Sequence, residues 1–274
     1  MADFFQQNDD FKQILLNVFN DNNFTFKIIP TGWTNLVLDI QHKNNNYIAK
    51  FPRNSFWAQQ IQKDCDISNF VRENIGINSP EMKIFKDKFG RFFSMHKKIN
   101  GTTFGEKFNT LSTDDKSKIA KQLVSIFYKL HSFNIDKIDK KYKYDFVEFL
   151  NNMIKIANNY DMKYFEELFK DHNNEQLVFA HNDINIGNII IDENNNIVAI
   201  IDYAFAGLSD IYTDLSVISC RTDGVFFNRM IEEYEKLISK TINKEKLQNR
   251  IELRQHLEDV YVDYINKNCK EIKI

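Results

Sequence analysis

One polar segment restricts the possible folds and chemistry of this 274-residue chain more than any other feature. The segment begins at Phe179 and reads FAHNDINIGN, and it continues without a break into the Ile-rich run Ile189–Asp192. Its core is His181, then Asp183 two residues later, then Asn188 five residues after that. The spacing His-x-Asp-x4-Asn therefore places three polar side chains in a short loop that leads directly into an apolar strand.

The strand after this segment is expected to form a hairpin. Residues 188–192 and 197–201 both have strand character, and the polar tip 193–196 joins them. If the hairpin closes symmetrically around Asn194 and Asn195, Asn188 faces Ile201 and lies beside Asp202. Opposed residues of such a pair are roughly 4.5–5.5 Å apart at Cβ. The hairpin therefore predicts that an amide and a carboxylate converge close to Asp183.

These residue types suit phosphoryl transfer. That reaction needs a carboxylate that orients the attacking hydroxyl, and it needs ligands that hold Mg²⁺ against the phosphates of a nucleotide. Asp183 fits the first task, while Asn188 and Asp202 offer the hard oxygen ligands that Mg²⁺ prefers. The sequence thus predicts a metal-assisted phosphotransferase site.

The rest of the chain predicts an α+β fold with two lobes, 1–98 and 99–274. The first lobe is expected to be a small antiparallel sheet with helices, over 9–20 (helix), 25–29, 36–42 and 47–51 (strands), 55–74 (helix), and 82–85 and 91–99 (a hairpin). The second lobe is expected to be mainly helical around one β region, with helices over 113–133, 144–157 and 162–170 and across much of 224–274. This order of elements therefore predicts a small sheet lobe followed by a larger, mainly helical lobe.

Charge and composition exclude several classes of protein. The formal net charge is −2, which argues against a nucleic-acid binder with a basic stripe. No apolar run reaches the roughly 18 residues that cross a bilayer, and the first residues lack a secretory signal pattern. The three cysteines lie far apart, as expected for a cytoplasmic protein. Residues 1–98 carry 13 basic and 10 acidic side chains, against 23 and 28 in residues 99–274.

The motifs together resemble the aminoglycoside phosphotransferase and choline kinase superfamily, a branch of the protein-kinase-like fold. The resemblance covers residues 25 to 220 and is most specific in the segment around Asp183. Four further stretches carry it: the strand 47–53 with Lys50, the loop 32–35, the Leu130-His131 pair, and residues 200–215 with Asp202, Asp210 and Asp214. The resemblance implies the protein-kinase-like, two-lobed α+β fold, with the nucleotide site in the first lobe and the acceptor site in the second.

The resemblance also implies roles for single residues. Asp183 would be the catalytic base, with His181 bracing its loop, and Asn188 and Asp202 would hold Mg²⁺. Lys50 would contact the α- and β-phosphates of ATP or GTP.

On the nucleotide side, Thr34 and Asn35 belong to the loop that covers the nucleotide in this superfamily. Asp66 lies where the family's helix offers a carboxylate to the lysine. Because an Asp is shorter than the usual Glu, Asp64 and Glu73 stay open as alternatives.

The expected activity is transfer of a γ-phosphate to a hydroxyl of a small molecule. An aminoglycoside O-phosphotransferase is the first choice, because the Pro52-Arg53 pair after the lysine strand and the residues around Asp183 resemble that branch. A choline, ethanolamine or other metabolite kinase is the alternative within the class. A nucleotide-binding pseudokinase is the alternative outside it, and the retained Lys50, Asp183, Asn188 and Asp202 argue against that alternative.

The acceptor is expected to be cationic. The excess of acidic side chains in residues 99–274 would attract a polycation. The C-terminal stretch adds acidic and aromatic residues: Glu258, Asp259, Tyr261, Asp263 and Tyr264.

Overall fold

The structure is a computed structural model, and it describes residue 5 and residues 9–29, 34–139, 162–169 and 175–268. The predicted helix over 144–157 and the loop residues Gly32 and Trp33 lie outside the described residues. The chain divides into two compact units. The first contains Met1–Gly101 together with Ala199–Ala204, and the second contains Thr102–Val198 and Phe205–Ile274.

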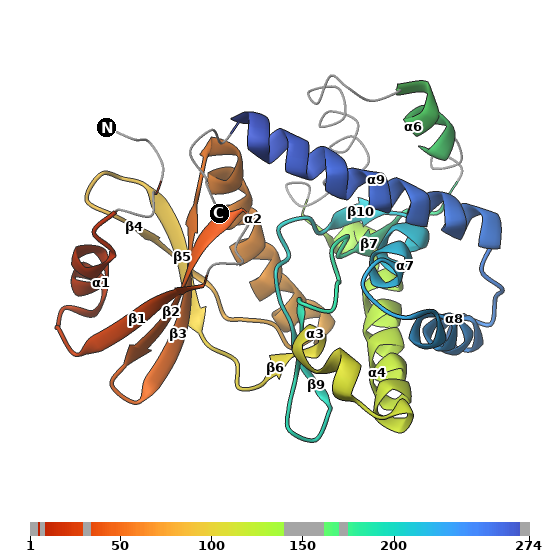
Figure 1. Ribbon diagram of the computed structural model, residues 1–274, viewed down its shortest axis with the longest axis horizontal. Helices are drawn as coiled ribbons and strands as arrows, with labels where there is room; N and C mark the ends of the chain where they lie inside the picture. The colour runs from red at the N-terminus through yellow and green to blue at the C-terminus, as the bar shows by residue number, and fades with distance from the viewer. Residues whose placement is uncertain (1–4, 6–8, 30–33, 140–161, 170–174, 269–274) are drawn as a thin grey trace. The chain divides into compact units, whose positions relative to one another are not determined.

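The first unit is an antiparallel sheet of five strands in the order β1-β2-β3-β5-β4 (Figure 1). Its elements are α1 (Phe11–Phe19), β1 (Phe24–Ile29), β2 (Asn35–His42), β3 (Asn45–Pro52), α2 (Ser55–Phe70) with a π-helical turn (Val71–Ile75), β4 (Lys83–Lys86) and β5 (Phe92–Lys97). The short β2–β3 connection sets a register in which Val37 faces Lys50, and β5 places Ser94 opposite Lys50 on the other side. The predicted strands and helices of this lobe are confirmed.

Alternation along the strands divides the sheet into two faces. One face packs against α1 in an aromatic core, in which Phe51 stacks on Phe93 at 4.6 Å and meets Phe11 edge to face at 5.0 Å. Because Ala49 and Phe51 point into this core, Lys50 between them points to the other face. The core thus fixes the direction of the one cation on β3 that the sequence marks as functional.

The second unit is mainly helical. Its helices are α3 (Phe104–Lys107), α4 (Thr113–His131), α6 (Met162–Phe169), α7 (Ile211–Ser219), α8 (Gly224–Ile238) and α9 (Lys244–Asn268), with 3₁₀ turns at Phe108–Thr110 and Ile135–Lys137. Its short strands are β6 (Thr102–Thr103), β7 (Val178–Ala180), β8 (Ile189–Ile191) and β10 (Gly207–Ser209), together with the start of β9 (Ile197–Ile200), whose last two residues belong to the first unit. They form two small sheets, β10-β7 and β6-β8-β9. The predicted fold class, a small antiparallel-sheet lobe followed by a mainly helical one, is confirmed.

The β8–β9 hairpin closes one residue away from the predicted position. The Asp192 amide donates to the Asn196 carbonyl at 3.0 Å, so the turn is centred on Asn194 and not between Asn194 and Asn195. Asn195 adopts the left-handed conformation, with φ 58°, which lets the turn take an additional residue on one side. Symmetric closure was the assumption behind the predicted facing of Asn188 and Ile201.

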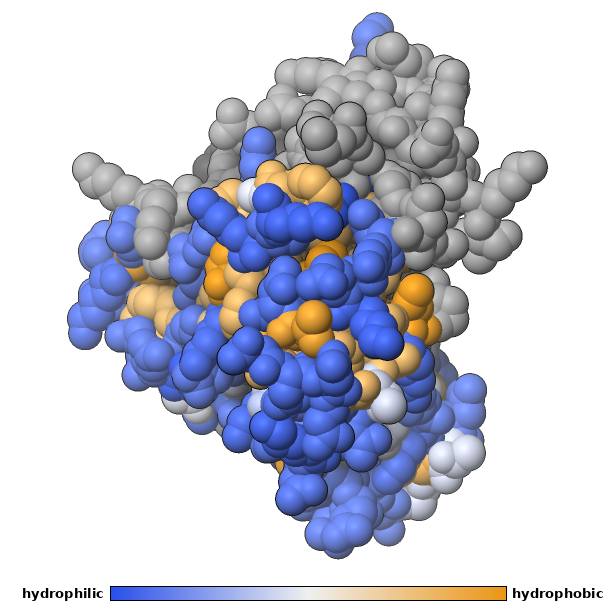
Figure 2. All heavy atoms as spheres, turned by 90° about the vertical axis from the view of Figure 1, so that its left-hand side faces the viewer, coloured by the Kyte–Doolittle hydropathy of each residue, from blue (hydrophilic) through white to orange (hydrophobic). Residues whose placement is uncertain are grey.

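The surface of the described residues carries few large apolar side chains. In the first unit Ile28, Phe89 and Phe92 are exposed, and the face in Figure 2 is mainly hydrophilic, with apolar side chains in small separate groups. Single exposed apolar residues are normal on a globular protein. Within the described chain no helix is long and apolar enough to cross a membrane.

Candidate active site

Lys50 lies between two carboxylates of its own unit. Its Nζ donates to Asp64 Oδ2 at 2.7 Å and lies 3.2 Å from Asp202 Oδ1. The Lys50 and Asp64 side chains are buried, whereas that of Asp202 is 36% exposed. Burial alone would lower the pKa of Lys50, but the charges of Asp202 and Asp64 outweigh it and raise that pKa. Lys50 is therefore a fixed, permanently charged cation.

The helix partner of Lys50 is Asp64, so the predicted pairing with Asp66 is wrong. On a helix, residues two apart point about 200° away from each other, and only one of them can face the sheet. Asp64 is buried against the lysine, while Asp66 Oδ1 accepts a hydrogen bond from Gln62 one turn earlier on α2. Asp64 was one of the alternatives that the sequence left open.

Asp64 also holds the residue next to Asp202. Its second oxygen accepts the Tyr203 amide at 2.7 Å. Asp202 itself has φ 68°, a left-handed conformation that costs energy for any residue other than glycine. The contacts of Asp64 with Tyr203 and of Lys50 with Asp202 stabilise this turn, which directs the Asp202 carboxylate toward the lysine.

The two predicted nucleotide-loop residues contact each other. Asn35 Nδ2 donates to Thr34 Oγ1 at 2.9 Å. Asn35 is buried, and its Oδ1 has no hydrogen-bond partner among the described residues. A nucleotide-binding role for Thr34 and Asn35 stays a prediction.

In the second unit, the buried carboxylate of Asp214 organises the loop after β7. It accepts the amides of His181 at 3.0 Å and of Asn182 at 2.5 Å. Asn182 has φ 63°, and its side-chain amide donates to the Phe205 carbonyl at 3.1 Å. Because a buried carboxylate that accepts two backbone amides is both stabilised and fixed, the loop has one defined shape.

A chain of two further side chains holds Asp214. His131, at the end of α4, donates from Nε2 to Asp214 at 3.1 Å, and its Nδ1 is 2.7 Å from the hydroxyl of Tyr234 on α8. Burial, and then the charge of Asp214, raises the pKa of Tyr234, so its hydroxyl stays protonated and donates to Nδ1. These contacts give His131 a structural role, because it holds the carboxylate that fixes the loop.

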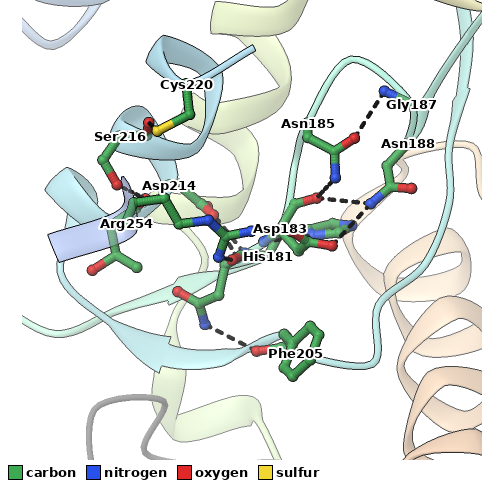
Figure 3. Close-up of polar contacts among 12 residues, drawn as sticks. His181, Asp183, Asn185, Gly187, Asn188, Phe205, Asp214, Ser216, Cys220 and Arg254 are labelled. Atoms are coloured by element: carbon green, nitrogen blue, oxygen red, sulfur yellow. Dashed lines mark hydrogen bonds and ion pairs between the residues drawn. The ribbon is translucent and has the colours of Figure 1, made fainter. Parts of the chain in front are cut away.

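Asp183 is held on both sides of its carboxylate (Figure 3). Asn188 donates from Nδ2 to the Asp183 carbonyl at 2.8 Å and to Oδ2 at 3.2 Å. Arg254 donates from Nη2 to Oδ1 at 2.5 Å. The amide of Asp183 donates to His181 Nδ1 at 3.2 Å, so the histidine braces the loop from within.

The amide orientation of Asn188 fits a metal ligand. Its nitrogen is used by Asp183, and its oxygen points away from Asp183 (Figure 3). An amide oxygen and a partly exposed carboxylate, that of Asp202, are ligands of the kind that Mg²⁺ takes. Asn188 belongs to the second unit and Asp202 to the first, so their convergence on one ion stays a prediction.

Arg254 was missed by the sequence reasoning. It lies on α9, more than 60 residues beyond the motif around Asp183, and an arginine on a charged helix gives no local signal. The same helix carries Arg250, whose guanidinium makes a buried pair with Asp210 at 2.8 Å. Only the folded chain brings α9 to the loop.

Comparison with known proteins finds a family model that matches most of the chain. The model of the phosphotransferase enzyme family, abbreviated APH, matches residues 25–238. "Probable choline kinase 3" of Arabidopsis thaliana is 46% identical over 50 residues, a match that spans 18% of this chain and only 14% of that protein.

Two solved structures have the same fold over nearly their whole length. A complex of APH(2")-IIia with GDP and kanamycin is 15% identical, with a TM-score of 0.75, and the match covers 95% of this chain and 92% of that one. An aminoglycoside-3'-phosphotransferase of type VIII is 14% identical, with a TM-score of 0.72 and coverages of 91% and 98%. At this level of identity the likeness establishes the fold alone.

Proposed function

The chain belongs to the phosphotransferase enzyme family, and we propose that it is a small-molecule kinase that moves the γ-phosphate of ATP or GTP to a hydroxyl group. The observation that carries the proposal is the ordered carboxylate of Asp183. It stands at the end of β7 on a loop fixed by Asp214, half-buried and hydrogen-bonded from two sides. A carboxylate held in this way can accept a hydrogen bond from a hydroxyl group and so direct the hydroxyl oxygen at a phosphate.

Lys50 supplies the positive charge for the nucleotide phosphates. Its buried position between Asp64 and Asp202 fixes the ammonium without help from a ligand. Such a preorganised cation stabilises charge on phosphate oxygens at no cost in reorganisation. Thr34 and Asn35, at the start of β2, are proposed to contact the same nucleotide.

Asn188 and Asp202 are proposed to hold Mg²⁺. The ion, when bound, would neutralise charge on the phosphates. The residues themselves have separate tasks. Asp202 offers a carboxylate whose direction is set by its left-handed backbone, and Asn188 offers an amide oxygen while its nitrogen orients Asp183.

An aminoglycoside is the acceptor that we propose first. The APH(2")-IIia structure contains kanamycin, and the curated match is named for choline, so both point to a cationic acceptor. Residues 99–274 carry the acidic excess that would attract such a molecule. Of the C-terminal acidic and aromatic residues, only Asp259 has a described side chain, and it is exposed; Glu258, Tyr261, Asp263 and Tyr264 lie outside the described side chains.

The test is acceptor-dependent consumption of ATP and of GTP across kanamycin and other aminoglycosides, choline and amino alcohols. An aminoglycoside should give the highest kcat/KM, and its KM should rise between low and high salt as the Debye length falls from about 14 to about 4 Å. A best acceptor that is neutral or acidic would exclude the aminoglycoside and leave the kinase in place. Nucleotide binding without any transfer would favour the pseudokinase alternative.

A further inference from the structure

We propose that Arg254 is a positioning residue for the catalytic base, so that the C-terminal helix α9 takes part in the chemistry. The inference rests on the proposed function, because it needs Asp183 to be the base. Arg254 lies beyond residue 238, where the family-model match ends. Its role is therefore drawn from this chain's own contacts.

The contact between Arg254 and Asp183 is short and charged. Nη2 lies 2.5 Å from Oδ1, and Nη1 lies 3.4 Å from the carbonyl of Asn182, the residue before the base. The two side chains are 18% and 17% exposed. A charge-assisted hydrogen bond at a mostly buried site is stronger than a surface ion pair. The guanidinium thus contacts both the carboxylate of the base and its backbone.

The position of Arg254 is fixed by the helix that carries it. One turn earlier on α9, Arg250 is buried, and it donates from Nε and Nη2 to Asp210 at 3.0 and 2.8 Å. Asp210 is also the N-cap of α7, where it accepts the Thr213 amide at 2.9 Å. Asp214, which holds the loop, follows in the first turn of the same helix. A buried ion pair therefore ties α9, which carries the arginine, to α7, which carries the Asp214 that holds the loop of the base.

Two donors determine the plane of the Asp183 carboxylate. Arg254 engages Oδ1, and Asn188 engages Oδ2. An ionised carboxylate has about four acceptor positions, and these two donors occupy one on each oxygen. Phosphoryl transfer through a loose transition state depends more on orienting the hydroxyl than on the strength of the base. The arginine is therefore expected to act mainly on kcat.

A competing interpretation is that Arg254 blocks the base until an acceptor displaces it. This interpretation predicts the opposite result, because removal of the arginine would then make the enzyme faster. The second contact of the guanidinium, at the Asn182 carbonyl, favours positioning, because it ties Arg254 to the backbone of the loop and not only to the carboxylate.

The experiment compares Arg254→Ala, Arg254→Lys and the exposed neighbour Gln255→Ala as the control on the same helix. Two rates are measured for each protein: kanamycin-dependent transfer and slow hydrolysis of Mg-ATP and Mg-GTP, in which water is the acceptor. Arg254→Ala should lower kcat in both by about 10–10²-fold, the usual effect of a misplaced reacting group, while KM for nucleotide stays within about twofold. Gln255→Ala should match wild type. Free guanidine at millimolar concentration should restore part of kcat in Arg254→Ala and nothing in the control.

A double-mutant cycle with Asp183→Asn separates positioning from a general loss of structure. If Arg254 acts through Asp183, its removal should have little effect on kcat once the carboxylate is gone. Full additivity, a wild-type or faster kcat in Arg254→Ala, or absence of guanidine rescue at an unchanged thermal midpoint would each overturn the proposal. If Arg254→Ala unfolds, Arg254→Lys carries the test, since it keeps the charge and loses the second donor.

Because water is the acceptor in hydrolysis, the Arg254 test does not depend on which small molecule the enzyme phosphorylates. A wild-type chain that hydrolyses nucleotide without stimulation by kanamycin would refute the acceptor, while the Arg254 comparison would still be decided on hydrolysis. A wild-type chain that neither hydrolyses nor transfers would overturn the proposed function and the role of Arg254 together.

Discussion

Replacing Asp64 by Asn tests whether Asp64 is the charged partner of Lys50, the residue that we propose contacts the nucleotide phosphates. The change keeps the size of the side chain and removes one negative charge next to Lys50, at the 2.7 Å contact. Asp66→Asn is the matched control, because the same substitution is made two residues later on α2, away from the lysine. We expect a large loss of stability in the first variant and almost none in the second.

The magnitude follows from burial and distance. Two unit charges 2.7 Å apart attract each other by about 6 kcal/mol at an effective dielectric constant near 20. Asp202 remains 3.2 Å from Lys50 and retains part of that attraction. Removal of one partner from a buried pair usually costs about 3–5 kcal/mol, and we expect the lower end, about 3 kcal/mol or roughly 10²-fold in the folding equilibrium. Asp66→Asn should cost less than about 0.5 kcal/mol, as is usual for a partly exposed side chain.

The assay is urea unfolding followed by fluorescence, in which the buried Trp57 reports on α2 itself. Nucleotide affinity is measured in parallel by titration. Asp64→Asn should shift the urea midpoint and weaken nucleotide binding, because Lys50 loses the contact that fixes it. Equal effects of the two variants, or a loss below about 1 kcal/mol in Asp64→Asn, would refute the argument that Asp64 is the charged partner.

Three further predictions follow from the geometry. Asp183→Asn should lower kcat by about 10²–10⁴-fold with nucleotide affinity retained, measured as acceptor-dependent transfer and by titration. Asp202→Ala should remove most of the Mg²⁺-dependent nucleotide affinity and Asn188→Ala less of it, since a neutral amide holds a dication less strongly; unchanged affinity in Asp202→Ala would refute the metal assignment. Burial lowers the pKa of His96 to about 4. Because the unfolded side chain titrates near 6.5, stability should fall as the pH drops from 6.5 toward 4, and His96→Gln should remove about 2 kcal/mol of the loss measured by urea unfolding between pH 7 and pH 5.

The sequence was sufficient for the fold because local signals were strong and consistent. Alternating apolar residues gave the five strands of the first unit, and helical periodicity gave α1, α2 and α4 close to their observed limits. The loop around Asp183 was also accessible, since its polar residues are adjacent in the chain. Its shape, however, depends on Asp214, which accepts a loop amide from α7, and on His131, which contacts Asp214 from α4.

The errors have geometric causes. Asp64 and Asp66 lie on different faces of α2, and the lysine pairs with the one whose face packs against the sheet. Both residues are aspartates, so the residue type could not show which face that is. The hairpin register moved by one residue because Asn195 takes a left-handed conformation that symmetric closure does not include. Arg254 escaped because its partner is 71 residues away in the chain.

On the proposed metal assignment, the position of Asp64 explains how Lys50 and a metal ion can share the carboxylate of Asp202. If Lys50 had only Asp202 as a partner, its buried ammonium would contact both oxygens of the Asp202 carboxylate. It would then compete with a metal ion for them. Asp64 takes the shorter contact with Lys50, and Asp202 uses Oδ1 alone at 3.2 Å. Its second oxygen has no ion-pair contact among the described residues, and the side chain is more than one-third exposed. On the proposed assignment, Asp64 therefore frees Asp202 for Mg²⁺, so Asp64→Asn should weaken binding of Mg-nucleotide more than binding of nucleotide without the metal.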